Sequence, residues 1–137
     1  MARGGFKVNK SALTAEFNKI RDFAELEAKS FTNDIADDAI RFSINFVDTG
    51  AYITSFSFST GSGRPRGVTS RRKQRNQPAG QKAAEGRDLL AGDIAELNFE
   101  TLQNLKLRNG SPHAEVVEEN LQKKVFKRLG IKYGWYN

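Results

Sequence analysis

The feature that most constrains the fold is a run of apolar residues with helical spacing near the start of the chain. Between residues 11 and 46, apolar side chains recur at steps of three, four or seven, which places them on one stripe of a helix. They are Leu13, Phe17, Ile20, Ala24, Phe31, Ile35, Phe42 and Phe46. Polar residues, among them Asp34, Asp37 and Asp38, fill much of the opposite side and are interpreted as a solvated face. The pattern predicts one long amphipathic helix over 11–46 whose phenylalanines pack into a core.

A turn and a strand are predicted to follow this helix. The turn is Asp48-Thr49-Gly50, because Gly50 can adopt a positive φ and Asp48 can bond to the backbone ahead of it. Residues 51–60 then alternate. Tyr52, Thr54, Phe56 and Phe58 point one way, and Ile53, Ser55 and Ser57 point the other. A period of two, rich in aromatic and β-branched residues, predicts a strand with one buried face.

Later in the chain, a helix and a second strand are predicted. Leu90, Ile94 and Leu97 share one face of a helix over 83–98, although Gly86 and Gly92 are weak helix formers. The strand is predicted over 103–109, where two leucines alternate with two cations. These are Leu105 and Leu107, and Lys106 and Arg108. The dipeptide Asn109-Gly110 then predicts a turn.

A last helix is predicted to open at Ser111-Pro112, since proline is favoured at the first helical position. Its apolar stripe is Ala114, Val117, Leu121, Val125 and Leu129. Four cations, Lys123, Lys124, Lys127 and Arg128, suit the negative end of the helix dipole, and Gly130 is predicted to end the helix.

These elements predict an α+β fold in a single domain over 1–137. A long N-terminal helix packs on a small antiparallel sheet, with two further helices and a long basic loop. A chain of 137 residues is long enough to bury a core without disulfides. Residues 1–10 and 131–137 are predicted as arms. The aromatic residues Tyr133, Trp135 and Tyr136 of the second arm can fold back on the core or dock on a neighbouring subunit, and Trp135 and Tyr136 are the docking candidates.

Residues 61–82 carry a net charge of +7 and the rest of the chain carries −1, so this segment accounts for the net charge of +6. The segment is rich in glycine, proline and serine, and it contains no acidic residue. Its cations are Arg64, Arg66, Arg71, Arg72, Lys73, Arg75 and Lys82. A loop of this length in a small domain is functional or disordered. Three interpretations stay open: a solvated flexible loop, contact with DNA phosphates, and contact with an acidic patch on a partner.

Catalytic chemistry has little support in the sequence. The chain has no cysteine, and its one histidine, His113, lies beside a proline at the predicted start of a helix. A tetrahedral zinc site therefore lacks ligands, and no phosphate-loop pattern follows Gly61-Ser62-Gly63. We expect no enzyme activity and no cofactor. No apolar run approaches the length of a membrane span, and the first residues lack the apolar core of a signal peptide.

Two short motifs resemble a known family. Val47-Asp48-Thr49-Gly50, between a long helix and a strand, resembles the VDTG signature of phage tail-completion and neck proteins, the group that includes Z-type minor tail proteins. In that family a later strand ends in asparagine, followed by a proline-tyrosine-alanine step and a glutamate. Asn109, Pro112, Ala114 and Glu118 match this second signature.

The resemblance covers roughly residues 10–120, with two departures. His113 replaces the usual tyrosine, and Glu119-Asn120 stands where the family tends to place glycine.

The resemblance implies a structural protein without enzyme activity that forms a ring around the DNA channel at the junction of head and tail. Its implied partners are further copies of itself, the portal or adaptor and the tail proteins. Its implied location is the neck of the virion, with assembly in the host cytoplasm.

The alternative is a protein that binds DNA without sequence preference through the loop over 61–82. An enzyme such as a nuclease would require a cluster of metal-binding carboxylates, and the sequence offers none.

Overall fold

A computed structural model of the chain describes the following residues: 13–17, 24–46, 51–60, 77–102, 105–111, 118 and 124–133. Within them, three antiparallel strands form a small sheet in the order β1-β3-β2. The strands are β1 (Leu13–Phe17), β2 (Phe56–Ser59) and β3 (Leu105–Asn109), so the last strand in sequence lies in the centre. Asn109 at the end of β3 lies opposite Leu13 on one side and Phe56 on the other. The sheet therefore joins three segments that are far apart in the sequence.

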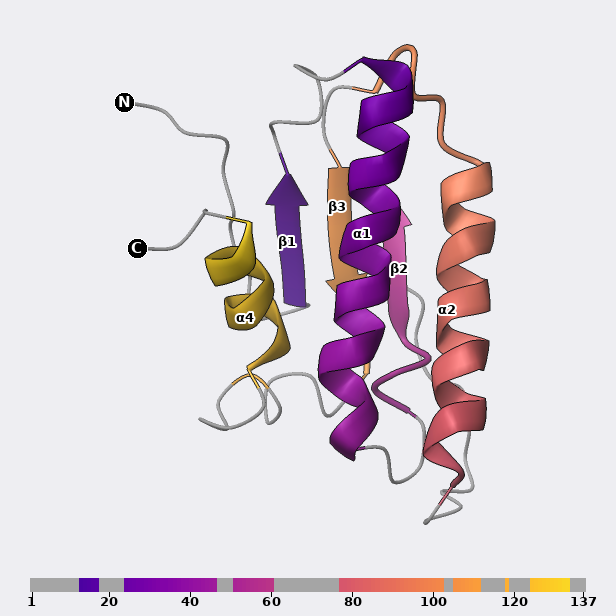
Figure 1. Ribbon diagram of the computed structural model, residues 1–137, viewed down its shortest axis with the longest axis vertical. Helices are drawn as coiled ribbons and strands as arrows, with labels where there is room; N and C mark the ends of the chain where they lie inside the picture. Colours follow the sequence, from indigo (N-terminus) through magenta and orange to yellow (C-terminus); the bar gives the residue numbers. More distant parts are fainter. Residues whose placement is uncertain are drawn as a thin grey trace.

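Helices cover one face of this sheet. The helix α1 (Glu25–Ser43) lies in front of the sheet and continues into a short 3-10 helix, η2 (Ile44–Phe46). The helix α2 (Ala79–Ala95) lies on one side of α1, and α4 (Val125–Lys132) lies on the other side (Figure 1). The side chain of Asp93 in α2 accepts a hydrogen bond of 3.0 Å from the Phe58 N–H, so it occupies a donor of the edge strand β2.

One hydrophobic core lies between the helices and the sheet. Its largest fully buried side chains come from every layer: Phe17, Phe56, Phe126, Ile35, Ile53, Leu90, Leu105, Leu107, Leu129 and Val125. The α+β class predicted from the sequence is thus confirmed, as is the second strand, in which Leu105 and Leu107 are buried.

The predicted helix over 11–46 is wrong at its start. Leu13–Phe17 is the strand β1, and the helix begins at Glu25. The error has a simple cause, since a spacing of four, as between Leu13 and Phe17, returns to the same face of a strand as well as of a helix. Pairing with β3 decides between the two periods, and it places Phe17 opposite Leu105 with its ring fully buried.

The strand predicted over 51–60 is shorter than expected. Residues 51–54 form a turn, and β2 begins at Phe56. The prediction of one buried face is also wrong, because Ile53, Ser55 and Ser57 are buried together with Phe56 and Phe58. The hydroxyl of Ser55 donates to the Ala51 carbonyl, which explains how a polar side chain is accommodated inside the turn.

Both later helices differ from prediction in their bounds. The helix α2 begins at Ala79 and not at residue 83, after Pro78 at its N-cap, and it ends at Ala95. Gly130 does not end the last helix, since α4 continues to Lys132 and the Tyr133 N–H bonds to the Leu129 carbonyl. The predicted opening of that helix at Ser111-Pro112 lies largely outside the described residues.

Candidate functional site

Of the seven predicted loop cations, only Lys82 lies within the described residues. It belongs to α2, so the predicted loop ends before it, and its Nζ lies 3.2 Å from the Glu85 carboxylate. Lys82 is therefore a helix residue with an ion-pair partner. The remaining six loop cations, the predicted turn at Asp48-Thr49-Gly50, and Trp135 and Tyr136 lie outside the described residues.

Asn109, the strand-ending asparagine of the second motif, is buried and bonds in two directions. Its Nδ2 donates to the Tyr52 carbonyl over 2.9 Å, and its Oδ1 accepts from the Ser111 N–H over 2.9 Å. The next N–H, of Gly110, donates to the Ser55 carbonyl. The end of β3 is thus fastened to the turn over 51–55.

Glu118, the glutamate of the same motif, caps α4. Its two carboxylate oxygens accept the N–H groups of Phe126 and Lys127, each over 2.9 Å. These groups belong to the first turn of α4 and have no acceptor inside the helix, and the N-cap residue Lys124 provides no side-chain bond. Glu118 thus supplies from outside the helix the bonds that a capping residue normally makes.

Tyr52 contributes to the surroundings of both motif residues. Its ring packs edge-on against Phe56, with the centroids 5.1 Å apart. Burial raises the pKa of the Tyr52 hydroxyl, and the Glu118 carboxylate raises it further. The pKa of Glu118 is itself raised by burial, against the opposing effect of the two N–H groups and of nearby lysines. The resemblance singles out Asn109 and Glu118; the structure adds Tyr52 as the residue that links them.

We expect Glu118→Ala to destabilise the protein by about 1–2 kcal/mol, as the loss of a helix cap does. The cause is that two N–H groups of α4 lose their acceptor. Glu118→Gln retains one acceptor oxygen and should cost less. Urea denaturation of the three proteins checks this order, and equal stability of all three would show that Glu118 does not cap α4.

A second polar cluster joins α4 to α1 around Asp38. Its carboxylate lies 2.6 Å from Lys132 Nζ and accepts a hydrogen bond of 2.6 Å from the Tyr133 hydroxyl. The Arg41 guanidinium donates to the same carboxylate over 2.8 Å. The Asp38 side chain is only 7% exposed. The interpretation of Asp38 as part of a solvated face is therefore wrong.

The sequence holds a signal for this buried aspartate. Asp38 follows Phe31 by seven residues and Ile35 by three, and it precedes Phe42 by four, so it lies on the apolar stripe itself. A charged residue at such a position requires buried partners. Those partners, Lys132 and Tyr133, lie in the segment predicted as a C-terminal arm, which is why the sequence alone does not reveal them.

The balance of forces on Asp38 favours its charged form. Burial of the carboxylate raises its pKa, but the hydrogen bonds from Lys132, Tyr133 and Arg41 outweigh this effect, and the net pKa is lowered below 3.8. A lowered folded-state pKa contributes stability above the unfolded pKa, and this contribution is lost as the pH falls through the folded value.

We expect Asp38→Asn to lower the free energy of unfolding by about 1.5–3 kcal/mol at neutral pH, the range for hydrogen bonds to a charged group. The difference from wild type should shrink as the pH falls from 3.8 through the lowered pKa of folded Asp38, because the wild-type carboxylate then becomes neutral as well. Denaturant titrations of wild type and variant at neutral pH and at a pH below 3.8 measure this difference in the free energy of unfolding. A difference that is the same at both would mean that the charge of Asp38 is not what stabilises α4.

The prediction of a C-terminal arm over 131–137 is wrong for residues 131–133. Ile131 and Lys132 belong to α4, and the Tyr133 ring packs edge-on against Phe31 at 5.4 Å between centroids. The sequence leaves two interpretations open for the aromatic residues of the tail, packing on the core or docking on a neighbour. Tyr133 packs on the core. Residues 134–137 of the predicted arm lie outside the described residues.

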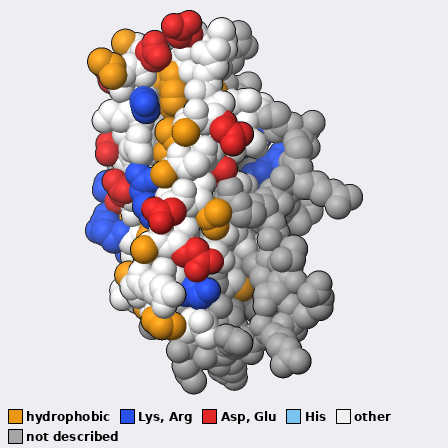
Figure 2. Space-filling view, turned by 90° about the vertical axis from the view of Figure 1, so that its right-hand side faces the viewer, with side chains coloured by type: hydrophobic (Ala, Val, Ile, Leu, Met, Phe, Trp, Pro, Cys, Tyr) orange, Lys and Arg blue, Asp and Glu red, His pale blue; other side chains and the backbone are white. Residues whose placement is uncertain are grey.

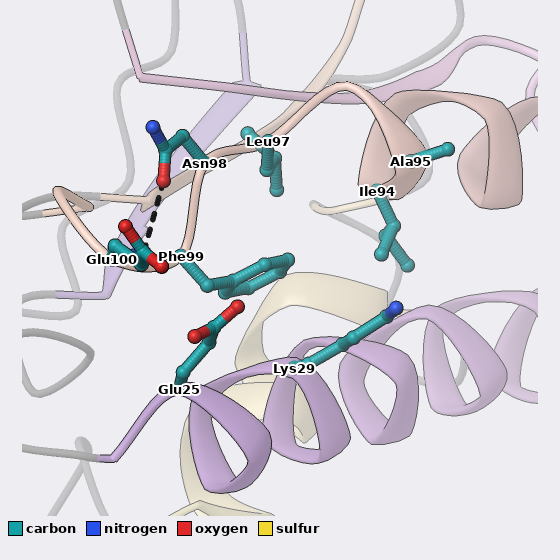
Figure 3. Close-up of a pocket in the computed structure, with 8 residues that line it drawn as sticks. All are labelled: Glu25, Lys29, Ile94, Ala95, Leu97, Asn98, Phe99 and Glu100. Atoms are coloured by element: carbon teal, nitrogen blue, oxygen red, sulfur yellow. Dashed lines mark hydrogen bonds between the residues drawn. The ribbon is translucent and has the colours of Figure 1, made fainter.

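A pocket of about 390 Å³ opens between the start of α1 and the end of α2. Ile94, Leu97 and Phe99 form its apolar part, and Phe99 points inward above α1 (Figure 3). Its polar lining consists of Glu25, Lys29, Asn98 and Glu100, with the backbone N–H of Glu100 bonded to the Asn98 side chain. These lining residues provide no arrangement of nucleophile and base.

Within the described parts of the chain, no group of three or more histidine, aspartate or glutamate side chains could hold a metal ion. No helix among those residues is long and apolar enough to cross a membrane. Comparison with known protein families, with characterised proteins and with solved structures gives no match.

Proposed function

We propose that this chain is a structural joining protein of a tailed phage, a neck or tail-completion protein that assembles as a ring between the head and the tail. In this role it binds further copies of itself, the portal or adaptor on one side and the tail on the other. It surrounds the DNA channel and catalyses no reaction.

The observation that carries the proposal is the role of the two signature residues Asn109 and Glu118. Both residues stabilise the fold: Asn109 bonds the central strand β3 to the turn over 51–55, and Glu118 caps α4. Residues 51–55 directly follow Asp48-Thr49-Gly50 of the first motif in the sequence. Asn109 of the second motif therefore bonds to the segment that comes directly after the first motif. Motif residues that stabilise the fold favour a structural function over a catalytic one.

A complementation assay tests the proposal in the phage that encodes the protein. Removing the gene should leave DNA-filled heads and complete tails that do not join, as seen by electron microscopy. Supplying the wild-type chain from a plasmid should restore joined, infectious particles. Joined particles in the absence of the protein would contradict the proposed role.

The alternative, a DNA-binding protein that acts alone, is supported by the positive charge of the predicted loop, of whose seven cations six precede α2. Under either function we expect the Arg71→Ser, Arg72→Ser, Lys73→Ser and Arg75→Ser variant to fold as wild type does, because the segment contains one large apolar residue, Val68. In the joining role this variant should give fewer infectious particles.

The same variant separates DNA contact from protein contact. If the four cations bind phosphates, the slope of log K against log salt for duplex binding should fall by up to about 0.9 for each cation removed. If they bind an acidic protein surface, duplex affinity should be weak in both proteins and only joining should suffer. Fully infectious, DNA-filled particles from the variant would show that the loop has neither role.

A further inference from the structure

The two exposed large apolar side chains of the described surface have opposite electrostatic surroundings. Leu26 in α1 is 81% exposed and lies between Glu25 and Glu27 in the sequence. Ile131 in α4 is 59% exposed, and its neighbours on the same helix are cations. An apolar residue surrounded by one sign of charge is an anchor suited to a surface of the opposite sign.

The cations around Ile131 lie on one side of α4. Lys124, Lys127 and Arg128 precede Ile131 by seven, four and three residues, which is the spacing of a single helix face, and Lys132 follows Ile131 directly. We call Lys124, Lys127, Arg128, Ile131 and Lys132 the α4 face. Arg128 is held in place, since its guanidinium carbon lies 4.1 Å from the centre of the Phe42 ring.

Helix stability does not explain this charge. The sequence places Lys124 and Lys127 toward the C-terminal end of a long helix, where cations are favourable. The structure places Lys124 at the N-cap and Lys127 in the first turn of α4, at the positive end of the dipole. The adjacent carboxylates of Glu118 and Asp38 are occupied by backbone N–H groups and by Lys132, Arg41 and Tyr133. Because Lys132 is paired with Asp38, the excess positive charge of the exposed α4 face comes from Lys124, Lys127 and Arg128.

The surroundings of Leu26 provide the complement. Glu25 and Glu27 flank it in the sequence, and Glu25 also lines the pocket together with Glu100, Leu97 and Phe99. Figure 2 shows acidic and apolar side chains side by side at the end of the molecule where α1 begins and α2 ends. We call Leu26, its sequence neighbours Glu25 and Glu27, and the pocket that Glu25 and Glu100 line the α1 end. Among the described residues, Lys29 is the one cation that lines this pocket.

The α4 face and the α1 end lie on different sides of the protomer, since α4 flanks α1 on the side away from α2 (Figure 1). Two different, complementary surfaces on one chain make a head-to-tail contact, which generates a ring or a filament rather than a two-fold dimer. We infer that the α4 face of one copy docks on the α1 end of the next copy, with Ile131 as its apolar anchor. This inference rests on the proposed ring assembly and names its contact surfaces.

Disulfide trapping tests the contact directly, because the chain has no cysteine of its own. The test protein carries both Leu26→Cys and Ile131→Cys, and mild oxidation of the full chain should give a ladder of dimers, trimers and longer species. Each single-cysteine variant should stay monomeric, and an equal mixture of the two should stop at dimers. The matched control pairs Leu26→Cys with Ala91→Cys, an exposed position on α2, and should give no ladder.

Two further measurements sharpen the outcome. The ladder should weaken as salt rises, because the contact pairs opposite charges. In the cysteine-free chain, Ile131→Asp should weaken self-association about tenfold in sedimentation experiments, as the loss of an interface anchor does. Dimers from a single-cysteine variant would instead indicate a two-fold contact and overturn the inference, as would a ladder no stronger than the control.

The test is separable from that of the proposed function. If no disulfide ladder forms but the wild-type chain is still required for joining heads to tails, the contact between the α4 face and the α1 end is rejected and the joining role stands. If a strong disulfide ladder forms but phage particles neither contain the chain nor require it for assembly, the contact is supported and the joining role is rejected.

Discussion

Phe126→Ala should lower the free energy of unfolding by about 3–5 kcal/mol, the range for removing a buried phenylalanine ring. The ring is fully buried in α4, 6.1 Å from the Phe56 ring between centroids. The same residue donates its N–H to Glu118, so a cavity at this point loosens the start of α4 as well. Urea denaturation followed by circular dichroism measures the loss.

Since a small domain has only about 5–15 kcal/mol of stability, the alanine variant can unfold outright. Phe126→Leu, which keeps most of the volume, should cost less and remain folded. Ile131→Ala on the exposed side of the same helix is the matched control, and it should stay within about 0.5 kcal/mol of wild type. Equal effects of Phe126→Ala and Ile131→Ala would contradict the placement of α4 on the core.

Gly86→Ala should destabilise the protein by about 2 kcal/mol, even though alanine is the better helix former by about 1 kcal/mol. A Cβ at this position would lie 2.3 Å from the Ile53 carbonyl oxygen and 3.1 Å from Ile40 Cδ1. No rotamer change can move a backbone oxygen, so α2 would have to shift away from the turn over 51–55.

Gly92 in the same helix provides the control. A Cβ there would meet nothing within 4 Å, so Gly92→Ala should stabilise the protein by up to about 1 kcal/mol. The two variants differ only in position along α2. Opposite signs in thermal denaturation would support the close approach of α2 to residues 51–55, and two stabilising substitutions would refute it.

The contrast between these glycines also shows what the sequence can and cannot reveal. From the sequence, Gly86 and Gly92 are equal weaknesses in a predicted helix. In the structure, Gly86 is a contact point between α2 and the turn that contains Tyr52 and Ile53, whereas Gly92 is exposed. The local pattern identifies the helix, but only the tertiary arrangement distinguishes a required glycine from a tolerated one.

The same limit applies to the strands. The alternation of Leu105 and Leu107 against Lys106 and Arg108 is unambiguous, and it predicts β3 correctly. The spacing of Leu13 and Phe17 fits a helix and a strand equally, and the choice depends on pairing with a strand near the other end of the chain. Such long-range pairing leaves no local signal, so the sequence pattern does not reveal β1.

The candidate site divides in a similar way. The resemblance singles out Asn109 and Glu118, but their bonds to Tyr52 and to α4 cannot be read from the sequence. Asp38 is interpreted from the sequence as part of a solvated face although it lies on the apolar stripe, because Tyr133, a partner that makes its burial possible, is 95 residues away. The basic loop is identified by composition alone, and most of its cations lie outside the described residues.

Locating the protein in the particle tests most directly whether it is a structural component of the neck. Purified virions should contain the chain in several copies per particle by quantitative mass spectrometry, and labelled antibody should place it at the junction of head and tail in electron micrographs. Both results are expected of a ring-forming joining protein. Its absence from purified virions, together with strong salt-dependent binding of duplex DNA by the free monomer, would contradict that role and favour the alternative function.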